Sequence, residues 1–532
     1  MAGAVPPAVT SSASASAASA PPTELEELSA EASALAASLR AEAQAAEAAA
    51  ERALANLRRL ISPETQLWCH YQQRWSWAAN APPQLVVIGS YGCGTARHRA
   101  ADTSGIDVTI LLEQPGTNPV VLNAEEQRGL LTQLARRLYA AKTSGEKTTH
   151  GSEGQGQETW VGDVELVLHE RVPRLHVVDG HSKLRMEVFA CHHLGIANTS
   201  LLRTYLSVNP NAHKLCQLVA NWARVRRLSS GVSSPSIPLL STYAWCVLTI
   251  HFLQRCSPPA LPVLQDASLL EGVRRTSIMR YDKSNNFAFF DCTFCSDVQA
   301  ARAAWAFSAW SPSSQASSVA GLFGRDQRAD QRGGRAGGSE GIASLGESLI
   351  GFFAHYASFD FEGGVASVRS GGMLRKEEMV WEANGPHLFC IEDPFETTRD
   401  LGSVLTPESL ATIRAELTRA HNLLSERREA GARFVSVGDR TSQPPSASAA
   451  AEPAPWSQTL GELLTESPAT PLAAPSMAPS MHMAPSSSSA SAGGERRELP
   501  FDAWLGAFAA EPKVPGLVNG FGGGLGGLGA SD

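Results

Sequence analysis

The sequence lacks several features that define common classes of protein. It has no uninterrupted apolar run of roughly eighteen residues, so no membrane-spanning helix is expected. It also lacks a basic excess. The formal net charge is −8, so nucleic acid binding would have to come from a local basic surface rather than from bulk attraction. The first arginine is Arg40, and no basic segment precedes an apolar one, which is unlike a secretory signal or a mitochondrial presequence.

A disulfide framework is also missing. The nine cysteines are an odd number and are scattered along the chain, which favours a reducing compartment. We therefore expect a cytoplasmic protein, with a nuclear location as the alternative. Cys292 and Cys295 form a single C-x-x-C pair without a second pair at zinc-ribbon spacing, so buried free thiols are the favoured interpretation over a metal site.

Large apolar residues are scarce at both ends of the chain. Residues 1–22 are mostly Ala, Ser and Pro, and the region 428–532 is dominated by low-complexity sequence. Such segments bury too little apolar surface to offset the entropy cost of ordering them, so both are predicted to be disordered, as is a Ser/Gly/Arg-rich loop at 312–342.

Residues 23–62 are predicted to form one long helix. Thr23 and Glu26 have the spacing of a capping box, Ala and Leu dominate, and Pro63 ends the pattern. The leucine stripe is incomplete, so a weak coiled coil that binds a partner and a helix packed on the next domain fit equally well.

The predicted secondary structure of the interior changes from strands to helices near residue 197. Residues 63–197 carry strand signals with one amphipathic helix at Glu125–Lys142, and residues 198–427 carry helical spacing. The predicted fold class is α+β, with a small mixed sheet followed by a helical domain. The strand predictions are Gln84–Ile88, Ile106–Leu112, Trp160–Leu168, Leu175–Val178 and Leu184–Ala190, and the later helices include Thr199–Ser207, His213–Arg227, Leu240–Arg255, Leu345–Tyr356 and Pro407–Arg427.

One local sequence pattern indicates a site for nucleotide chemistry. Val86–Thr95 runs from a strand into a Gly-rich turn containing Gly89 and Ser90, where backbone N–H groups could receive a triphosphate. Asp107 then begins the next strand within Ser104-Gly-Ile-Asp-Val-Thr-Ile110. Nucleotide transfer needs a phosphate cradle and carboxylates for divalent metals, and Mg²⁺ prefers oxygen ligands.

A Gly-Ser turn followed by Asp-h-Thr-h resembles the signature of the nucleotidyltransferase superfamily. Further segments resemble its terminal uridylyltransferase and poly(A)-polymerase-like family, in family order: Leu184–Tyr205, Leu218–Arg224, Leu240–Gln254, Ser344–Tyr356 and Cys390–Gly402. The resemblance covers about residues 63–425. It implies a nucleotidyltransferase palm domain at 63–197 and a helical domain whose segment from about 344 to 402 is the one associated with poly(A) polymerases.

The resemblance implies a role for each matching residue. Asp107 and Glu187 would be catalytic and would hold Mg²⁺ or Mn²⁺. The nucleotide would be bound by Gly89 and Ser90 at the phosphates, Asn198 and Thr199 at the ribose, Arg224 and Thr242 at the triphosphate, Tyr243 by stacking on the base, and Glu396 and Arg399 in the base-reading loop. The expected substrates are an RNA 3′ end and UTP or ATP. In the family, His at the position of Arg399 accompanies uridine selection, and Arg decides neither base.

Three positions depart from the family pattern. Gly105 stands where the family has its first metal-binding carboxylate, and Glu187 stands where it has an Asp as the third. Ala220 stands where the family has one of its basic triphosphate-binding residues. Asp102, in a short insertion, could replace the missing carboxylate or be a solvated loop acid. The predicted function is therefore RNA 3′-terminal nucleotidyl transfer, and the alternative is a weakened or inactive member that binds RNA, nucleotide or a protein. Helix 23–62 or the C-terminal tail, where Pro500–Phe508 is apolar, could contact a protein partner.

Overall fold

The computed structural model describes residues 23–61, 83–95, 105–112, 120–144, 160–168, 171–230, 238–282, 286–310, 344–381, 385–438 and 454–465. All of these residues belong to one compact unit, Met1–Ala469. The predicted disordered segments 1–22 and 312–342, Asp102, and the apolar tail segment Pro500–Phe508 lie outside the described residues.

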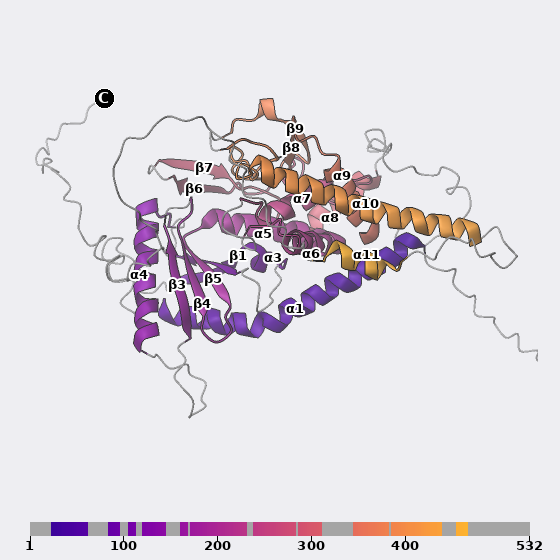
Figure 1. Ribbon diagram of the computed structural model, residues 1–532. Helices are drawn as coiled ribbons and strands as arrows, with labels where there is room; N and C mark the ends of the chain where they lie inside the picture. Colours follow the sequence, from indigo (N-terminus) through magenta and orange to yellow (C-terminus); the bar gives the residue numbers. More distant parts are fainter. Residues whose placement is uncertain are drawn as a thin grey trace, which may run out of the picture. The chain divides into compact units, whose positions relative to one another are not determined.

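A five-stranded mixed sheet carries the first half of the chain. Its strand order is β1-β2-β5-β4-β3, with β1 (Gln84–Ile88), β2 (Ile106–Leu111), β3 (Val161–Val167), β4 (Arg174–Asp179) and β5 (Arg185–Ala190). β2 and β5 run parallel, and the other neighbours run antiparallel. Helix α4 (Ala124–Ser144) packs along this sheet (Figure 1). Its Leu130, Leu134 and Leu138 meet the fully buried alternate residues Ile106, Val108 and Ile110 of β2 in one core.

Helices dominate the second half. They are α3 (Gly89–Cys93), α5 (His193–Val208), α6 (Pro210–Val225), α7 (Thr242–Arg255), α8 (Val298–Trp310), α9 (Leu345–Ala357), α10 (Pro407–Gly438) and α11 (Trp456–Leu463). Short strands pair among them: β6 (Ser277–Tyr281) with β7 (Phe287–Asp291), and β8 (Gly364–Ser367) with β9 (Gly372–Arg375) and β10 (Cys390–Ile391), with a 3-10 turn, η3, at Lys376–Glu378. The mixture of a small sheet and a helical region confirms the predicted α+β class.

The helical core is aromatic. The edge of Trp222 meets Trp245 and Phe353 at ring-centroid distances of 5.4 and 4.9 Å. Buried residues of α5 join this core from Leu194 onward, so the helical packing begins slightly before the predicted boundary at residue 197. The division into a palm domain at 63–197 and a helical domain at 198–427 stays a proposal. Within the described ranges, no helix is long and apolar enough to cross a membrane.

The predicted long helix forms as α1 (Glu24–Leu60), and its Thr23–Glu26 capping box is present. Its two halves pack in different cores. Leu28, Ala32, Ala36 and Leu39 enter the helical core, whereas Ala50, Ala53, Leu54, Leu57 and Leu60 enter the core beneath the sheet. The apolar stripe of α1 is thus buried within its own chain, which favours the packed-helix interpretation over the coiled coil.

The prediction of disorder from residue 428 onward is wrong for two segments. α10 continues to Gly438, and α11 forms at Trp456–Leu463. The reason is tertiary: the Trp456 indole N–H donates to Glu24 Oε2 of α1 at 3.0 Å, and the Arg427 guanidinium lies 4.6 Å from the indole centre. Leu460 and Leu463 are buried against the helical core. Composition could not reveal this docking, because Glu24 lies 432 residues away from Trp456 in the chain.

Candidate functional site

Four polar residues form a row across the sheet. Asp107 on β2 stands in direct parallel register with Glu187 on β5, Glu187 is paired with His176 on β4, and His176 with Glu165 on β3. The row forms because each strand alternates polar and apolar residues with a period of two, which places these side chains on the same face. The structure therefore brings together the two carboxylates that the sequence predicted as metal ligands.

Asp107 is an unusual carboxyl group. Its pKa is raised from 3.8 to about 7, first by burial and then by the neighbouring Glu187 carboxylate, while Arg174 acts in the opposite direction. Two carboxylates that share a buried site resist simultaneous ionisation unless a cation joins them. Asp107 is therefore a group that a proton or a cation must neutralise near neutral pH.

The Gly89 turn lies directly against Asp107. Gly89 has φ +67°, and a Cβ atom there would lie 2.1 Å from Asp107 Oδ2, so only glycine fits beside the carboxylate. The Gly89 N–H donates to the Thr199 hydroxyl at 2.9 Å, and that hydroxyl donates to the Gly195 carbonyl at 2.6 Å. The predicted phosphate turn, the predicted ribose contact Thr199 and the Asp107 carboxylate are thus assembled at one place. The Ser90 carbonyl accepts from the Thr95 N–H at 2.9 Å, which closes the turn.

Cations surround Glu187. Its carboxylate lies 3.5 Å from Arg174 Nε, 3.5 Å from His176 Nε2 and 3.9 Å from Arg185 Nε. Burial lowers the pKa of His176, which favours the neutral imidazole. Sequence analysis missed all three residues, although the alternation in Arg174-Leu-His176 and Arg185-Met-Glu187 was a usable signal.

Two predicted nucleotide-binding residues hold buried polar atoms without a protein partner. Asn198 Oδ1 and the Tyr243 hydroxyl have no hydrogen bond within the part of the chain that the structure describes. Burying such atoms unpaired is costly, so each is suited to a ligand or an ordered water. The Asp393, Arg399 and Glu396 charges all act on the Tyr243 hydroxyl, whose pKa is raised chiefly by burial. Tyr243 therefore lies beside the predicted base-reading loop.

Glu396 in that loop is already paired. Its carboxylate accepts from both Arg171, which precedes β4, and Arg280 of β6, and its side chain is 4% exposed. Arg399 reaches the buried Asp393 carboxylate at 3.3 Å through Nη1. The structure thus places Glu396 as a connection between the sheet region and the loop. Arg171 and Arg280 were not predicted, because Glu396 lies 225 and 116 residues away from them. Asp393 was not predicted either, although Arg399 follows it by only six residues.

The remaining predicted residues flank this assembly. Thr242 begins α7, and its hydroxyl lies 3.2 Å from that of Ser229. Arg224 of α6 is buried. The pKa of the Cys246 thiol is lowered chiefly by its hydrogen bond with Cys216, and the Arg224 charge lowers it further. Arg226 binds the Glu416 carboxylate of α10 with two hydrogen bonds of 2.8 and 2.7 Å, so its guanidinium serves helix packing.

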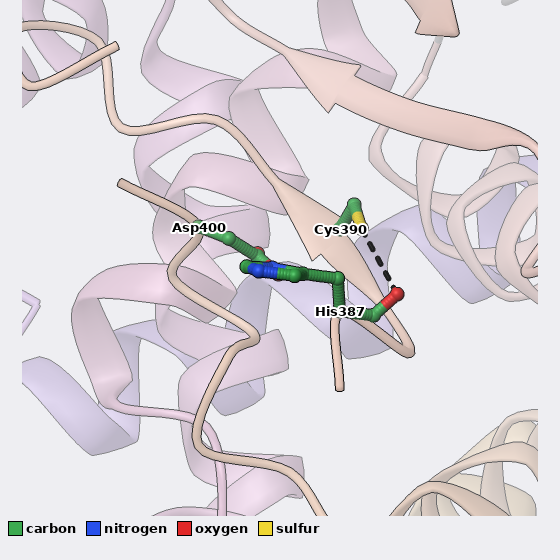
Figure 2. A group of neighbouring side chains, drawn as sticks. All are labelled: His387, Cys390 and Asp400. Atoms are coloured by element: carbon green, nitrogen blue, oxygen red, sulfur yellow. Dashed lines mark hydrogen bonds and ion pairs between the residues drawn. The ribbon is translucent and has the colours of Figure 1, made fainter. Parts of the chain in front are cut away.

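A second cluster lies away from the carboxylate row. Among the described residues, His387, Cys390 and Asp400 form one group whose ligand atoms are near enough to hold a metal ion (Figure 2). Their contacts indicate a structural role. His387 Nδ1 bonds Asp400 Oδ2 at 2.9 Å, the Cys390 thiol donates to the His387 carbonyl at 3.2 Å, and the Lys376 ammonium donates to that same carbonyl at 2.8 Å. An adjacent ammonium group disfavours a bound cation.

Comparisons with known proteins agree with the resemblance found in the sequence motifs. A family model described as Cid1 family poly A polymerase matches residues 344–399. The poly(A) RNA polymerase cid11 of Schizosaccharomyces pombe is 25% identical over 348 residues, which are 65% of this chain and 55% of the relative. The poly(A) RNA polymerase GLD2-A of Xenopus laevis is 25% identical over 266 residues, which are 49% of this chain and 42% of the relative.

These matches support a terminal uridylyl and poly(A) transferase family for this chain. It spans about half the length of the relatives just named. A solved structure of Cid1, described with RNA terminal uridylyl transferase activity, has a TM-score of 0.49 and 18% identity, and the match covers 84% of this chain and 100% of the solved one.

The structure explains one departure from the family pattern. At Gly105, where the family pattern has its first carboxylate, a Cβ atom would lie 2.8 Å from the Arg185 carbonyl oxygen and 3.2 Å from its carbon. The neighbour is backbone of the adjacent strand, which cannot turn aside as a side chain can. Ala220, the position of the lost basic residue, is buried one turn before Arg224 in α6. At residue 105 there is therefore too little space for the carboxylate side chain of the family pattern.

Restoring that carboxylate is expected to fail. Gly105→Asp should lower the free energy of unfolding by about 1–3 kcal/mol, because β2 must move away from β5, and should not raise the rate of nucleotide transfer. Urea unfolding and a primer-extension assay check the two parts. Gly461→Asp is the matched control, because a Cβ there meets nothing within 4 Å. A variant that is both as stable as the wild type and faster would contradict the steric argument.

Proposed function

We propose that this chain transfers nucleotides from a ribonucleoside triphosphate to an RNA 3′ end. The observation that carries the proposal is the register of Asp107 with Glu187, immediately beside the Gly89 turn. The similarity to poly(A) RNA polymerases supports the same activity. The turn, the carboxylates and the orphaned Asn198 and Tyr243 atoms would bind the triphosphate, the metal, the ribose and the base respectively.

Asp107 and Glu187 fit a divalent cation such as Mg²⁺ or Mn²⁺. Both are carboxylates, they are neighbours on parallel strands, and burial of Asp107 makes a counter-charge favourable. A bound ion would supply Lewis-acid stabilisation of the transferring phosphoryl group. The chain's own part is to orient the reactants: Gly89 leaves space for the Asp107 carboxylate against the turn, and Thr199 fixes the turn by accepting from the Gly89 N–H.

Tyr243, Arg399 and Glu396 would determine which base is accepted. Tyr243 offers an aromatic ring for stacking, which tolerates any base. Arg399 is 36% exposed and offers hydrogen-bond donors only, while Asp393 holds one end of its guanidinium. Glu396 would read a base edge only after leaving Arg171 or Arg280. Both adenylate and uridylate addition are compatible with these groups, so the nucleotide assay below decides between them.

A second candidate function is nucleotide or RNA binding without turnover. It is favoured by Gly105, which supplies no metal ligand, and by the cations that already contact Glu187. Both candidate functions use the same residues. They differ in whether the site stabilises the transition state or only the bound substrate.

The deciding experiment incubates the full chain with a labelled oligoribonucleotide, Mg²⁺ or Mn²⁺, and each ribonucleoside triphosphate in turn. Extension of the 3′ end is the expected result, and the nucleotide that is extended fastest identifies the substrate. Nucleotide binding by equilibrium dialysis without extension in any mixture would reject the transferase and support the binding function. Absence of both would reject both candidates.

A further inference from the structure

The carboxylate row is short of oxygen ligands for two ions. Along the row, Asp107 and Glu187 are adjacent, but the next residue is His176, and the next carboxylate, Glu165, stands one strand further on. Glu165 is 71% exposed and contacts the far nitrogen of His176 at 3.1 Å. Mg²⁺ requires near-octahedral oxygen coordination, so this row offers one good position for an ion, between Asp107 and Glu187.

The backbone closes the position that a third carboxylate would use. Gly105 precedes β2, and the Arg185 carbonyl on β5 occupies the space that its side chain would need. That contact is part of the β2–β5 packing, which holds the Asp107–Glu187 register. The lack of a ligand at residue 105 is thus built into the sheet.

A protein cation stands beside the same carboxylates. Arg174 Nε lies 3.5 Å from Glu187 Oε2, and the Arg174 charge also acts on Asp107. Arg174 is held in place, because its Nε donates to His176 Nε2 at 2.8 Å. Arg185 contacts Glu187 from the other side at 3.9 Å. The arrangement is a carboxylate pair with a guanidinium held next to it.

We propose that the site of this chain holds a single divalent ion, bound by Asp107 and Glu187, and that the Arg174 guanidinium takes the place of the second ion. The proposal rests on the proposed function for its location, since it concerns the same carboxylates. A guanidinium is permanently charged and planar, and it can pair with a carboxylate and a phosphate oxygen in fixed geometry. Arg174 is therefore a positioning and charge-balancing group for a triphosphate bound beside these carboxylates.

The test measures metal binding directly. The full chain is titrated with Mn²⁺ alone, followed by electron paramagnetic resonance, and is then dialysed against Mn²⁺ with a non-hydrolysable triphosphate to count bound ions. We expect one ion per wild-type chain in both experiments. Arg174→Met removes a charge close to the ion and should tighten Mn²⁺ binding about tenfold, and with the triphosphate it should admit a second ion.

Controls separate this result from general effects of charge. Arg136→Met removes the same charge from the exposed surface of α4 and should leave affinity and count unchanged. Arg174→Lys keeps the charge and should behave like the wild type in the Mn²⁺ titration, which also shows that the strand tolerates substitution. Two ions in the wild-type chain, including a second ion that Asp102→Ala removes, would overturn the proposal. So would unchanged Mn²⁺ affinity in Arg174→Met.

Failure of the proposed function gives a different pattern. A chain that extends no RNA but binds one Mn²⁺ with the Arg174 dependence described above keeps this inference and loses the transferase. A chain that extends RNA and binds two ions keeps the transferase and loses the inference.

Discussion

Asp107→Asn is expected to reduce RNA 3′ extension by about a thousandfold or more. The change removes a negative charge from the carboxylate pair that would hold the metal ion, while the amide keeps nearly the same shape. Losing a positioned electrostatic stabiliser of this kind costs several kcal/mol of transition-state stabilisation. The measurement is initial-rate extension of a labelled oligoribonucleotide at saturating nucleotide.

The same variant should be more stable than the wild type in metal-free buffer above pH 7. Asp107 has its pKa raised from 3.8 to about 7, first by burial and then by Glu187, so the folded chain holds this proton more tightly than the unfolded chain. The stability that the protonated group contributes is complete below pH 3.8 and is lost as the pH rises through about 7. Urea unfolding at pH 5 and pH 8 with a chelator measures the difference.

Asp163→Asn is the matched control, because Asp163 is 91% exposed on β3. It should retain both the activity and the pH dependence of the wild type. Gain of stability together with loss of activity is the signature of a functional carboxyl group, whereas a structural one would lose stability. An Asp107→Asn protein that extends RNA at half the wild-type rate would remove Asp107 from the proposed mechanism.

Glu396→Gln is expected to lower the free energy of unfolding by about 3 kcal/mol at neutral pH. Glu396 is nearly fully buried between Arg171 and Arg280, and the amide would leave two guanidinium groups without a counter-charge. Because Arg171 belongs to the sheet region and Glu396 to the loop, the variant should also loosen the loop. Hydrogen exchange of residues 390–402 checks this second effect.

The loss of stability in Glu396→Gln should disappear at acidic pH. Burial, the largest influence, raises the pKa of Glu396, but Arg171, Arg280 and Arg399 together outweigh it and lower the pKa below 4.5. The stability from the paired carboxylate is therefore present above pH 4.5 and is lost as the pH falls through the lowered pKa. Glu377→Gln, an exposed residue of η3, is the control and should be neutral at every pH. A Glu396→Gln protein as stable as the wild type at pH 7 would show that the pairing contributes nothing.

Local sequence chemistry predicted the elements that depend on near neighbours. The capping box at Thr23 and Glu26 formed α1, and the Thr406 hydroxyl accepts from the Ser409 N–H at 3.2 Å at the start of α10. The strands around Gly89 and Asp107 formed where β-branched residues alternate. The sequence missed β6, β7, α8 and α11, because short apolar runs do not distinguish a hairpin or a docked helix from a loop.

The candidate site divides in the same way. Asp107, Glu187 and Gly89 could be named from the sequence because their order resembles a family pattern. The cations around Glu187 come from neighbouring strands, and their contacts depend on register, which no local pattern specifies. The Arg171–Glu396 pair joins positions 225 residues apart.

The sequence by itself determined the α+β class, the strands around the Asp107 motif and the capped helices, and it named candidate residues for binding metal and nucleotide, because periodicity, caps and motif order are local properties. Only the tertiary structure decided three matters. It showed that Gly105 has no space for a side chain beside Arg185, that Arg174 stands next to the carboxylate pair, and that α1 packs in both cores. Each depends on which strands and helices become neighbours, and burial there sets the sterics and charge that a linear pattern leaves open.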